Sequence, residues 1–177
     1  MPQYLLISGS PRKGNTDFVL SKIADSIKED SETIILRQKK IKHCIGCLMC
    51  HNKPECVIQD DMKEILDKMI DSKVIIIGTP NYFGNISGLL KDFIDRTHPV
   101  YTTSLLKGKK IILIMTGGSD VDKSAKYLAE STAGFIKYQK LDLIGSYCFQ
   151  ALNSGELSKD EKREDQIRPI IQQIKNI

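Results

Sequence analysis

The feature that most limits how this chain can fold is a series of short, uninterrupted apolar runs, each followed by a turn and a helical pattern. Runs without polar alternation are typical of strands buried on both faces, and strands separated by helices pair in parallel. The sequence therefore predicts an α/β fold with a doubly wound parallel sheet. Its five strands are expected at Tyr4–Ser8, Thr33–Leu36, Val74–Ile77, Ile111–Met115 and within Leu141–Phe149.

Apolar residues at helical spacing predict five helices between and after these strands. They are expected from Asp17 onward, after a cap at Asp60 or Asp61, around 89–94 with an end at Asp95–Arg96, around 125–136, and over 159–175 around Pro169. Five strands alternating with helices favour the flavodoxin-type strand order 2-1-3-4-5. We expect residues 1–177 to form a single domain of this type.

The composition favours a soluble globular protein. The chain has 177 residues and a net charge of +4, but 22 acidic residues are mixed among 26 basic ones, so a nucleic-acid partner is not expected. The first residues carry too short an apolar run for a signal peptide, and no stretch reaches the length of a membrane span. A cytoplasmic, reducing location is the expectation, and disulfides are then unexpected.

Residues 9–16, GSPRKGNT, nearly match the G-x-x-x-x-G-K-[ST] loop of nucleoside triphosphatases, but Asn15 stands where the lysine belongs. The loop leads from the first strand into a helix, whose free N–H groups and dipole favour an anion. Ser10, Asn15 and Thr16 add side-chain donors, and Arg12 adds a charged one. A triphosphatase also needs an acidic residue after another strand to help hold magnesium. The third and fourth strands end in Gly-Thr-Pro and Thr-Gly-Gly instead, so a terminal phosphomonoester fits this loop better than a triphosphate. The alternative is a polar turn with a helix cap.

Two further strand-end loops suit a flat ring. Residues 80–88, PNYFGNISG, carry the adjacent aromatic residues Tyr82 and Phe83 beside glycines that permit close backbone approach. Residues 116–120, TGGSD, offer backbone donors without side-chain bulk. The alternatives are that Phe83 packs in the core and that residues 116–120 form a mere turn. In such folds, ligands bind beyond the carboxyl ends of the strands, where all three loops begin.

Together, GSPRKGNT, TPNYFGNISGLLKDFIDR and MTGGS resemble the NAD(P)H-dependent FMN reductase and iron–sulfur flavoprotein families. The similarity spans nearly the whole chain and is weakest after residue 150. It implies a flavodoxin-like fold, FMN as cofactor, NAD(P)H as co-substrate, and a homodimer or homotetramer with the flavin near a subunit interface. By position, the phosphate would be held by Ser10, Arg12, Asn15 and Thr16. The ring would be lined by Pro80, Asn81, Tyr82, Phe83 and Gly84, with Thr116, Gly117 and Gly118 near another edge. Many members have one more residue between the Arg-Lys pair and Gly-Asn-Thr.

Four cysteines lie within a loop at 43–57, where CIGCLMCHNKPEC gives the spacing C-x2-C-x2-C-x5-C. This compact run resembles the cluster-binding runs of ferredoxins and of iron–sulfur flavoproteins, which hold a 4Fe–4S cluster near FMN. Structural zinc sites usually separate their two cysteine pairs by a longer loop. A cluster, a loop of free thiols and a zinc site all stay open. His51 is expected to be solvated and Cys148 to be a small buried hydrophobe. The candidate metal ligands are Cys44, Cys47, Cys50 and Cys56.

The resemblance implies hydride transfer from NADH or NADPH to FMN and then electron transfer to an acceptor. The acceptor would be a quinone, a nitro compound, a flavin or a one-electron carrier such as a ferredoxin-like partner. In such chemistry the protein supplies position and electrostatics, and we assign no catalytic residue, although Tyr82 can line the substrate side. One alternative is an electron-transfer protein without an organic substrate of its own. The other is a redox sensor that acts through its cysteines.

Overall fold

Five strands pair in parallel in the order β2-β1-β3-β4-β5 in the computed structural model, which describes residues 3–27, 30–159 and 162–177. The strands are β1 (Tyr4–Ser8), β2 (Ser31–Ile35), β3 (Val74–Pro80), β4 (Lys110–Gly117) and β5 (Asp142–Gln150). This order confirms the predicted doubly wound, flavodoxin-like fold. Its strand order reverses beside β1, which lies between β2 and β3.

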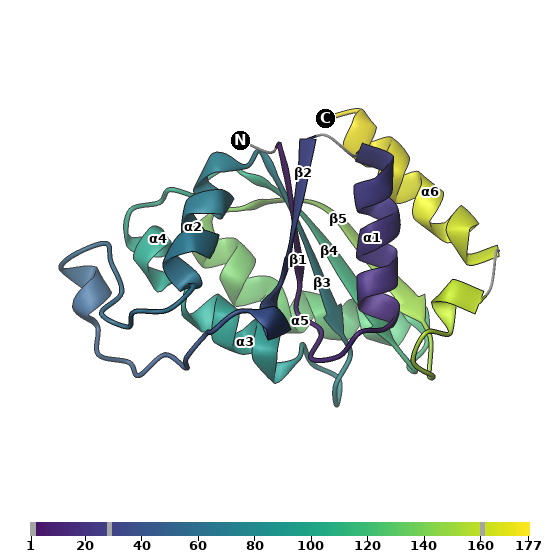
Figure 1. Cartoon of the computed structure of the whole chain (residues 1–177), viewed down its shortest axis with the longest axis horizontal. Coiled ribbons are helices and arrows are strands. Elements are labelled where there is room, and N and C mark those ends of the chain that lie inside the picture. Colours follow the sequence, from purple (N-terminus) through teal and green to yellow (C-terminus); the bar gives the residue numbers. More distant parts are fainter. Residues whose placement is uncertain (1–2, 28–29, 160–161) are drawn as a thin grey trace.

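Helices cover both faces of the sheet (Figure 1). One face carries α1 (Asn15–Ile27) and α6 (Lys162–Lys175). The other face carries α2 (Met62–Asp71), α3 (Gly88–Asp95), α4 (His98–Thr102) and α5 (Val121–Gln139). Short 3-10 helices also form among the described residues, including η2 (Leu36–Gln38), η3 (Met49–His51) and η4 (Leu157–Lys159). Within the described residues, no helix combines the length and apolarity needed to cross a membrane.

The buried strands explain why the apolar runs show no polar alternation. Successive side chains of a strand point to opposite faces of a sheet. In β3, Ile75 and Ile77 pack toward α2, α3 and α5, whereas Val74 and Ile76 pack toward α1 and α6. All four side chains are at most 2% exposed. Both faces therefore need apolar residues at every position.

The elements differ from the expectation at several points. β3 runs on to Pro80, because its last residues still pair with β4 in the register Thr79–Met115. The short helix α4 was not expected from the sequence; it carries a proline in its first turn, where no intrahelical N–H is needed. α6 contains Pro169, as expected. The helix predicted there also included residues 160–161, which lie outside the described residues.

The two-faced core makes a direct prediction about stability. Leu6 of β1 is fully buried (0% exposed), and Leu6→Ala should lower the free energy of unfolding by about 2–5 kcal/mol, because transfer energy is lost and a cavity remains. Leu143→Ala is the matched control on β5, where the side chain is 44% exposed, and it should change stability by about 0.5 kcal/mol or less. Denaturant titration measures both. Equal losses would contradict this account of the core.

Candidate functional site

The three predicted loops meet at one cavity beyond the carboxyl ends of β1, β3 and β4. The cavity has a volume of about 190 Å³ and also receives the segment that follows β5. Ten of the twelve predicted cofactor-binding residues line it, and Phe83 and Gly84 do not. The ten are Ser10, Arg12, Asn15, Thr16, Pro80, Asn81, Tyr82, Thr116, Gly117 and Gly118.

Two of the three larger cavities, the two with the greatest volume, are poorer candidates for a phosphate-bearing ligand. One, of about 730 Å³, lies beside α1 and β2; the carboxylates of Asp17 and Asp25 in its lining are balanced by Lys13 and Arg37, and no residue of the second or third loop lines it. The other, of about 430 Å³, lies among α3, α4 and α5, away from the three strand-end loops. The smaller cavity combines a helix N-terminus, a guanidinium group and an aromatic side chain.

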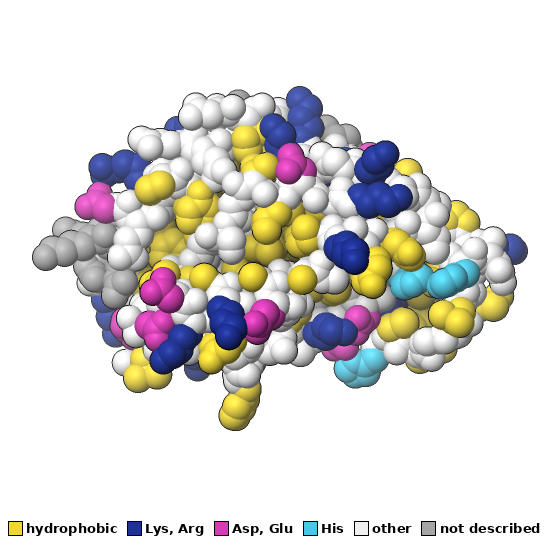
Figure 2. Space-filling view, turned by 180° about the vertical axis from the view of Figure 1, so that it is seen from behind, with side chains coloured by type: hydrophobic (Ala, Val, Ile, Leu, Met, Phe, Trp, Pro, Cys, Tyr) yellow, Lys and Arg dark blue, Asp and Glu magenta, His cyan; other side chains and the backbone are white. Residues whose placement is uncertain are grey.

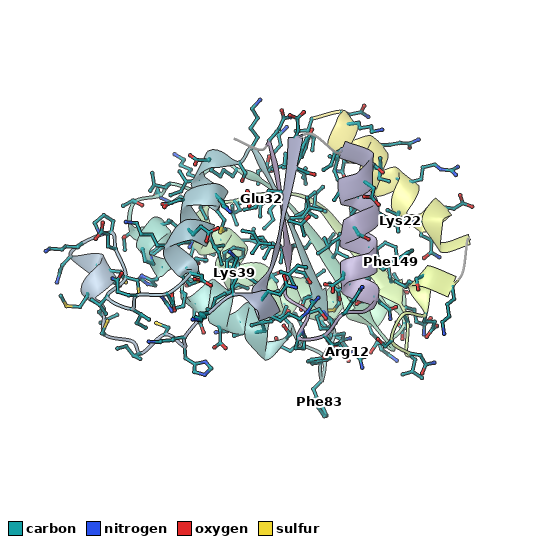
Figure 3. The ribbon with its side chains drawn as sticks, viewed as in Figure 1. Arg12, Lys22, Glu32, Lys39, Phe83 and Phe149 are labelled. Carbon is teal, nitrogen blue, oxygen red and sulfur yellow. The ribbon has the colours of Figure 1, made fainter. Side chains whose placement is uncertain are left out.

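The first loop presents an anion-binding helix end. The first hydrogen bond of α1 runs from Phe18 N–H to Gly14 O at 3.0 Å, so the N–H groups of residues 14–17 precede the hydrogen-bonded ladder of the helix. Ser10 is buried and its Oγ donates to Arg12 O at 2.7 Å, which fixes the turn. The side chain of Arg12 is exposed at the rim of the cavity (Figure 3). These groups suit a phosphate at the mouth of the helix.

Asn15 and Thr16 also hold the loop to other parts of the site. Asn15 Nδ2 donates to Asn153 O at 2.8 Å, and Asn15 Oδ1 accepts from Leu157 N–H at 3.2 Å. Thr16 Oγ1 and Thr116 Oγ1 lie 2.8 Å apart, and both residues are buried. The side chain of Asn15 is thus engaged by the chain after β5. Its backbone N–H belongs to the free end of α1.

The second loop forms a tight hairpin turn at residues 82–85. Tyr82 and Asn85 exchange two backbone hydrogen bonds, and Phe83 and Gly84 have φ angles of +52° and +72°, as in a type I′ turn. Positive φ is uncommon for a bulky residue and marks a position where strain is tolerated. The Phe83 side chain is fully exposed and projects away from the body of the molecule (Figure 3). The alternative that Phe83 packs in the core is therefore wrong.

Hydrogen bonds and close packing tie the three loops to one another. Gly9 N–H donates to Gly78 O at 2.8 Å, and Ser87 Oγ donates to Gly9 O, which joins the first loop to the second. Asn81 N–H donates to Thr116 O at 2.8 Å, which joins the second to the third. A Cβ atom at Gly117 would lie 2.7 Å from Asn81 Cβ, so only glycine permits this approach.

The segment after β5 contributes residues that the sequence analysis missed. Ala151 N–H donates to Gly117 O at 2.7 Å, and both Ala151 and Leu152 line the cavity. Leu152 is 76% exposed, and a Cβ atom at Gly118 would meet it at 2.9 Å. Turn residues Asn153, Ser154 and Gly155 directly after a strand were the available signal. The third loop and this segment form one wall of the cavity.

The cysteine loop forms a second, separate cavity. All four candidate cysteines line a space of about 50 Å³, together with Arg96 and His98. In the part of the chain that the structure describes, no three His, Cys, Asp or Glu side chains are placed as a ready-made metal site. The two cavities share no lining residue. The loop projects from the side of the domain that carries α2, α3 and α4 (Figure 1).

Histidines accompany the cysteine loop. Cys50 Sγ lies 3.5 Å from His98 Nδ1, and the ring of His51 stacks on that of His98 with centroids 4.7 Å apart. Histidine side chains gather with apolar ones at this end of the molecule (Figure 2). His51 is exposed, as expected, but it also stacks on another ring. His98 is a neighbour of the loop that the sequence analysis did not identify.

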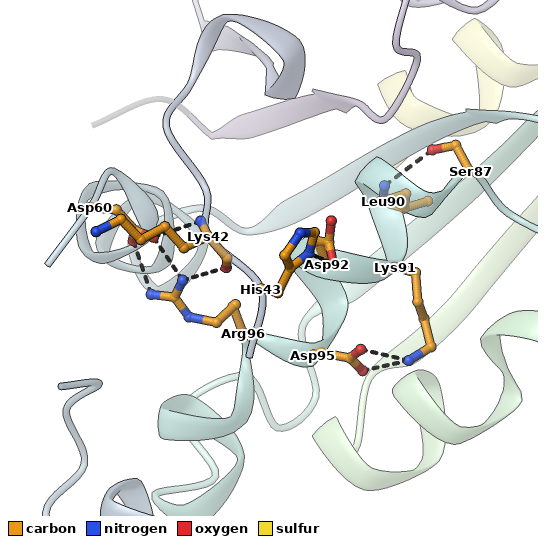
Figure 4. Close-up of polar contacts among 9 residues, drawn as sticks. All are labelled: Lys42, His43, Asp60, Ser87, Leu90, Lys91, Asp92, Asp95 and Arg96. Carbon is orange, nitrogen blue, oxygen red and sulfur yellow. Dashed lines mark hydrogen bonds and ion pairs between the residues drawn. The ribbon is translucent and has the colours of Figure 1, made fainter. Parts of the chain in front are cut away.

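A buried ion pair closes the base of the cysteine loop (Figure 4). The Arg96 guanidinium makes two hydrogen bonds to the Asp60 carboxylate, at 2.7 and 2.9 Å, and the two side chains are only 1% and 2% exposed. Burial acts to raise the pKa of Asp60, but hydrogen bonds, first from Arg96 and then from backbone N–H groups, outweigh it and hold that pKa below its usual value. The pair is charged at neutral pH.

Cys148 stands apart from the other four cysteines. It lies on β5, is half-buried, and packs against the core. Burial raises the pKa of its thiol to about 11. It is less buried than expected, but it has the protonated, unreactive character of a structural cysteine.

The chain is similar to proteins of a known family. The family model for NADPH-dependent FMN reductase matches residues 2–136. An iron–sulfur flavoprotein of Archaeoglobus fulgidus is 45% identical over 96 residues, which cover 52% of this chain and 47% of that protein. An iron–sulfur flavoprotein of Methanocaldococcus jannaschii is 36% identical over 165 residues, covering 89% of this chain and 83% of that protein. The match thus spans about half of the first relative and most of the second.

A solved structure supports the fold. General stress protein 14 of Treponema denticola, determined in complex with FMN, superposes with a TM-score of 0.59 at 17% identity. The superposition covers 94% of this chain and 92% of that protein. At this level of identity the likeness concerns the fold alone.

The bridging role of Asn15 is testable by amide hydrogen exchange. Asn15→Ala removes the acceptor for Leu157 N–H and the donor to Asn153 O, and we expect exchange of the Leu157 amide to accelerate about 5- to 30-fold, as losing one or two hydrogen bonds predicts. Asn153→Ala is the matched control, since it keeps the backbone carbonyl that Asn15 contacts. If both variants exchange alike, Asn15 does not hold this segment.

Proposed function

The chain belongs to the family of NADPH-dependent FMN reductases and iron–sulfur flavoproteins, and from that membership we propose that it is an FMN-dependent oxidoreductase that takes electrons from NAD(P)H. One observation carries the proposal. A helix N-terminus, a guanidinium group and an aromatic side chain converge on one cavity, although they come from loops far apart in the sequence. An anion and a flat ring are the two parts that FMN presents.

The residues present fit FMN in two zones. The N–H groups at the start of α1 and the guanidinium of Arg12 would hold the phosphate, and Ser10, whose Oγ donates to Arg12 O, would fix the turn that presents them. The cavity of about 190 Å³ is smaller than the roughly 300–1,000 Å³ of a typical small-molecule site, so the ring would extend past it. Tyr82 and Leu152, 40% and 76% exposed at the rim, offer apolar surface for that ring. The glycines of the third loop would let the ring edge approach the backbone.

The chain's own contribution to the reaction is binding and orientation. FMN, when bound, supplies the hydride-accepting and electron-releasing chemistry. The described lining of the cavity has no carboxylate and no imidazole, so proton transfer by such a group is not part of the proposal. The hydrogen bonds among the three loops hold the donors in place before ligand arrives, which reduces the entropy lost on binding.

We further propose that the cysteine loop holds a 4Fe–4S cluster. Four thiols lining one cavity support this, as does 45% identity over 96 residues to an iron–sulfur flavoprotein. A protein with both groups could pass electrons from a two-electron donor to a one-electron carrier, and it could do so without an organic substrate of its own. If the electrons do not pass to a one-electron carrier, the proposed final acceptor is a quinone, a nitro compound or a flavin. A sensor acting through free thiols is the alternative if no cluster forms.

A homodimer or homotetramer in the cytoplasm completes the proposal. Phe83 and Leu152 lie fully or mostly exposed beside the cavity. Exposed apolar side chains at the rim of a site are the kind of surface that a second subunit covers. A subunit interface there would shield the flavin ring from water.

Arg12 provides the test of the FMN site. Calorimetry should show that the wild-type protein binds FMN more tightly than ATP, and Arg12→Ala should weaken FMN binding about 10- to 150-fold, because a charge-assisted hydrogen bond contributes about 1.5–3 kcal/mol. Riboflavin, which lacks the phosphate, should lose little affinity. Lys13→Ala is the matched control, since Lys13 is an adjacent cation that does not line the cavity. Absence of FMN binding to the wild type would refute the proposal, and equal losses for both ligands would refute the phosphate role.

The cysteine loop is tested by its metal content. Protein prepared anaerobically with iron and sulfide should hold iron, and Cys47→Ser/Cys50→Ser should lose it while retaining bound FMN, because the two cavities share no residue. NAD(P)H oxidation with an artificial two-electron acceptor should persist, and transfer to one-electron acceptors should fail. Cys148→Ser is the control and should keep its iron. Zinc in place of iron, or no metal in the wild type, would leave the FMN proposal intact and end the cluster proposal.

A further inference from the structure

Arg96 is the most deeply buried charged side chain beside the cysteine loop. It is 1% exposed and comes from the end of α3, yet it lines the same cavity as the four cysteines. A buried cation requires partners for its charge and for its N–H groups. The hydrogen-bond partners of Arg96 therefore indicate its role beside the cysteine loop.

Four of the five N–H groups have partners that bracket the cysteine loop. One terminal nitrogen donates to Lys42 O at 2.7 Å and to Asp60 Oδ2 at 2.7 Å. The other donates to Asp60 Oδ1 at 2.9 Å and to Ile58 O at 3.4 Å. Asp60 in turn accepts from Lys42 N–H at 2.9 Å. Residue 42 precedes the first cysteine and residues 58 and 60 follow the last, so one guanidinium group joins both ends of the loop (Figure 4).

The fifth N–H group has no hydrogen-bond partner among the residues that the structure describes. This group is the Nε–H of Arg96, which is buried and donates no hydrogen bond to any of the described residues. A charged donor left unpaired in the interior is costly, and native structures rarely keep one without a reason. An arginine guanidinium does not lose its proton in a folded protein, so this group is a cation. The unpaired donor thus belongs to a permanent positive charge.

The other charge in the cavity wall is already compensated. Asp95 lines the cavity, and its carboxylate is paired with Lys91 at 2.6 and 2.7 Å. A cluster held by four thiolates is an anion whose sulfur atoms accept hydrogen bonds. Resting on the cluster proposed above, we infer that Arg96 donates its Nε–H to a sulfur of that cluster while its other N–H groups fix the ends of the loop.

This contact would make Arg96 a positioning residue that also tunes the cluster. Positive charge and hydrogen bonds to the sulfur atoms stabilise the reduced, more negative state and raise the reduction potential. A residue that only holds the loop would affect how much iron is retained. It would not move the potential of the clusters that remain.

Pulsed EPR tests the contact without requiring any variant to fold. Wild-type protein is made with ¹⁵N-labelled arginine in a ¹⁴N background, loaded with iron and sulfide, and reduced. We expect a ¹⁵N hyperfine coupling to the reduced cluster. Arg96→Lys keeps a cation beside Asp60 but lacks Nε and the planar fork, so the coupling should disappear. Arg37→Lys is the matched control, because Arg37 is paired with Asp17 elsewhere, and it should keep the coupling.

The midpoint potential gives an independent second readout. Arg96→Gln removes both the charge and the Nε–H, and it should disfavour the reduced cluster about tenfold, a shift of ~59 mV to lower potential for a one-electron couple. An iron-loaded wild type with no arginine coupling, or an unchanged potential in Arg96→Gln, would overturn this inference and leave the cluster proposal standing. A wild type without iron would overturn both.

Discussion

The parallel pairing of β1 with β3 is the constraint on which the cavity at the strand ends depends. Its register aligns Ser8 with Gly78, so the two strands end side by side and the loops that follow them begin at the same edge of the sheet. Parallel strands need crossover helices, and each helix after a strand begins at that edge with free N–H groups. The anion-binding end of α1 is therefore a consequence of the sheet. The short distance between the first and second loops follows from the same register.

The two cavities are held by different interactions. The cavity at the strand ends depends on hydrogen bonds between loops and on glycines that allow close approach, as at Gly117. At the base of the cysteine cavity, one buried ion pair, Arg96–Asp60, joins the two ends of the loop, and contacts such as Thr102 Oγ1 to Cys50 O at 3.2 Å hold its middle. Breaking a buried pair leaves an uncompensated charge and costs about 3–5 kcal/mol. Because the cavities share no residue, the loop can change without altering the cavity at the strand ends.

Residue patterns were sufficient for the strands, and ten of the twelve residues that they proposed for a cofactor line the cavity at the strand ends. Continuous apolar runs indicate that a strand is buried on both faces of the sheet, and glycines at strand ends indicate that another segment or a ligand approaches the backbone closely. The patterns failed where a role depends on distant partners. Phe83 follows a buried strand and was weighed as a core residue, but the turn at 82–85 places it outside. Arg96 marked only the end of a helix, because nothing local indicates that it contacts residues 42, 58 and 60.

The sequence by itself determined the doubly wound sheet, its strand order, the three strand-end loops and the compact run of four cysteines. Each of these follows from local spacing: continuous apolar residues, helical periodicity, glycines at strand ends, and four cysteines within thirteen residues. Only the tertiary structure decided that Asn15 holds the segment after β5, that Leu152 stands at the rim, and that Arg96 joins the ends of the cysteine loop with one N–H unpaired. These contacts join residues that are far apart in the chain. They depend on how the elements pack together, and no local sequence pattern encodes that packing.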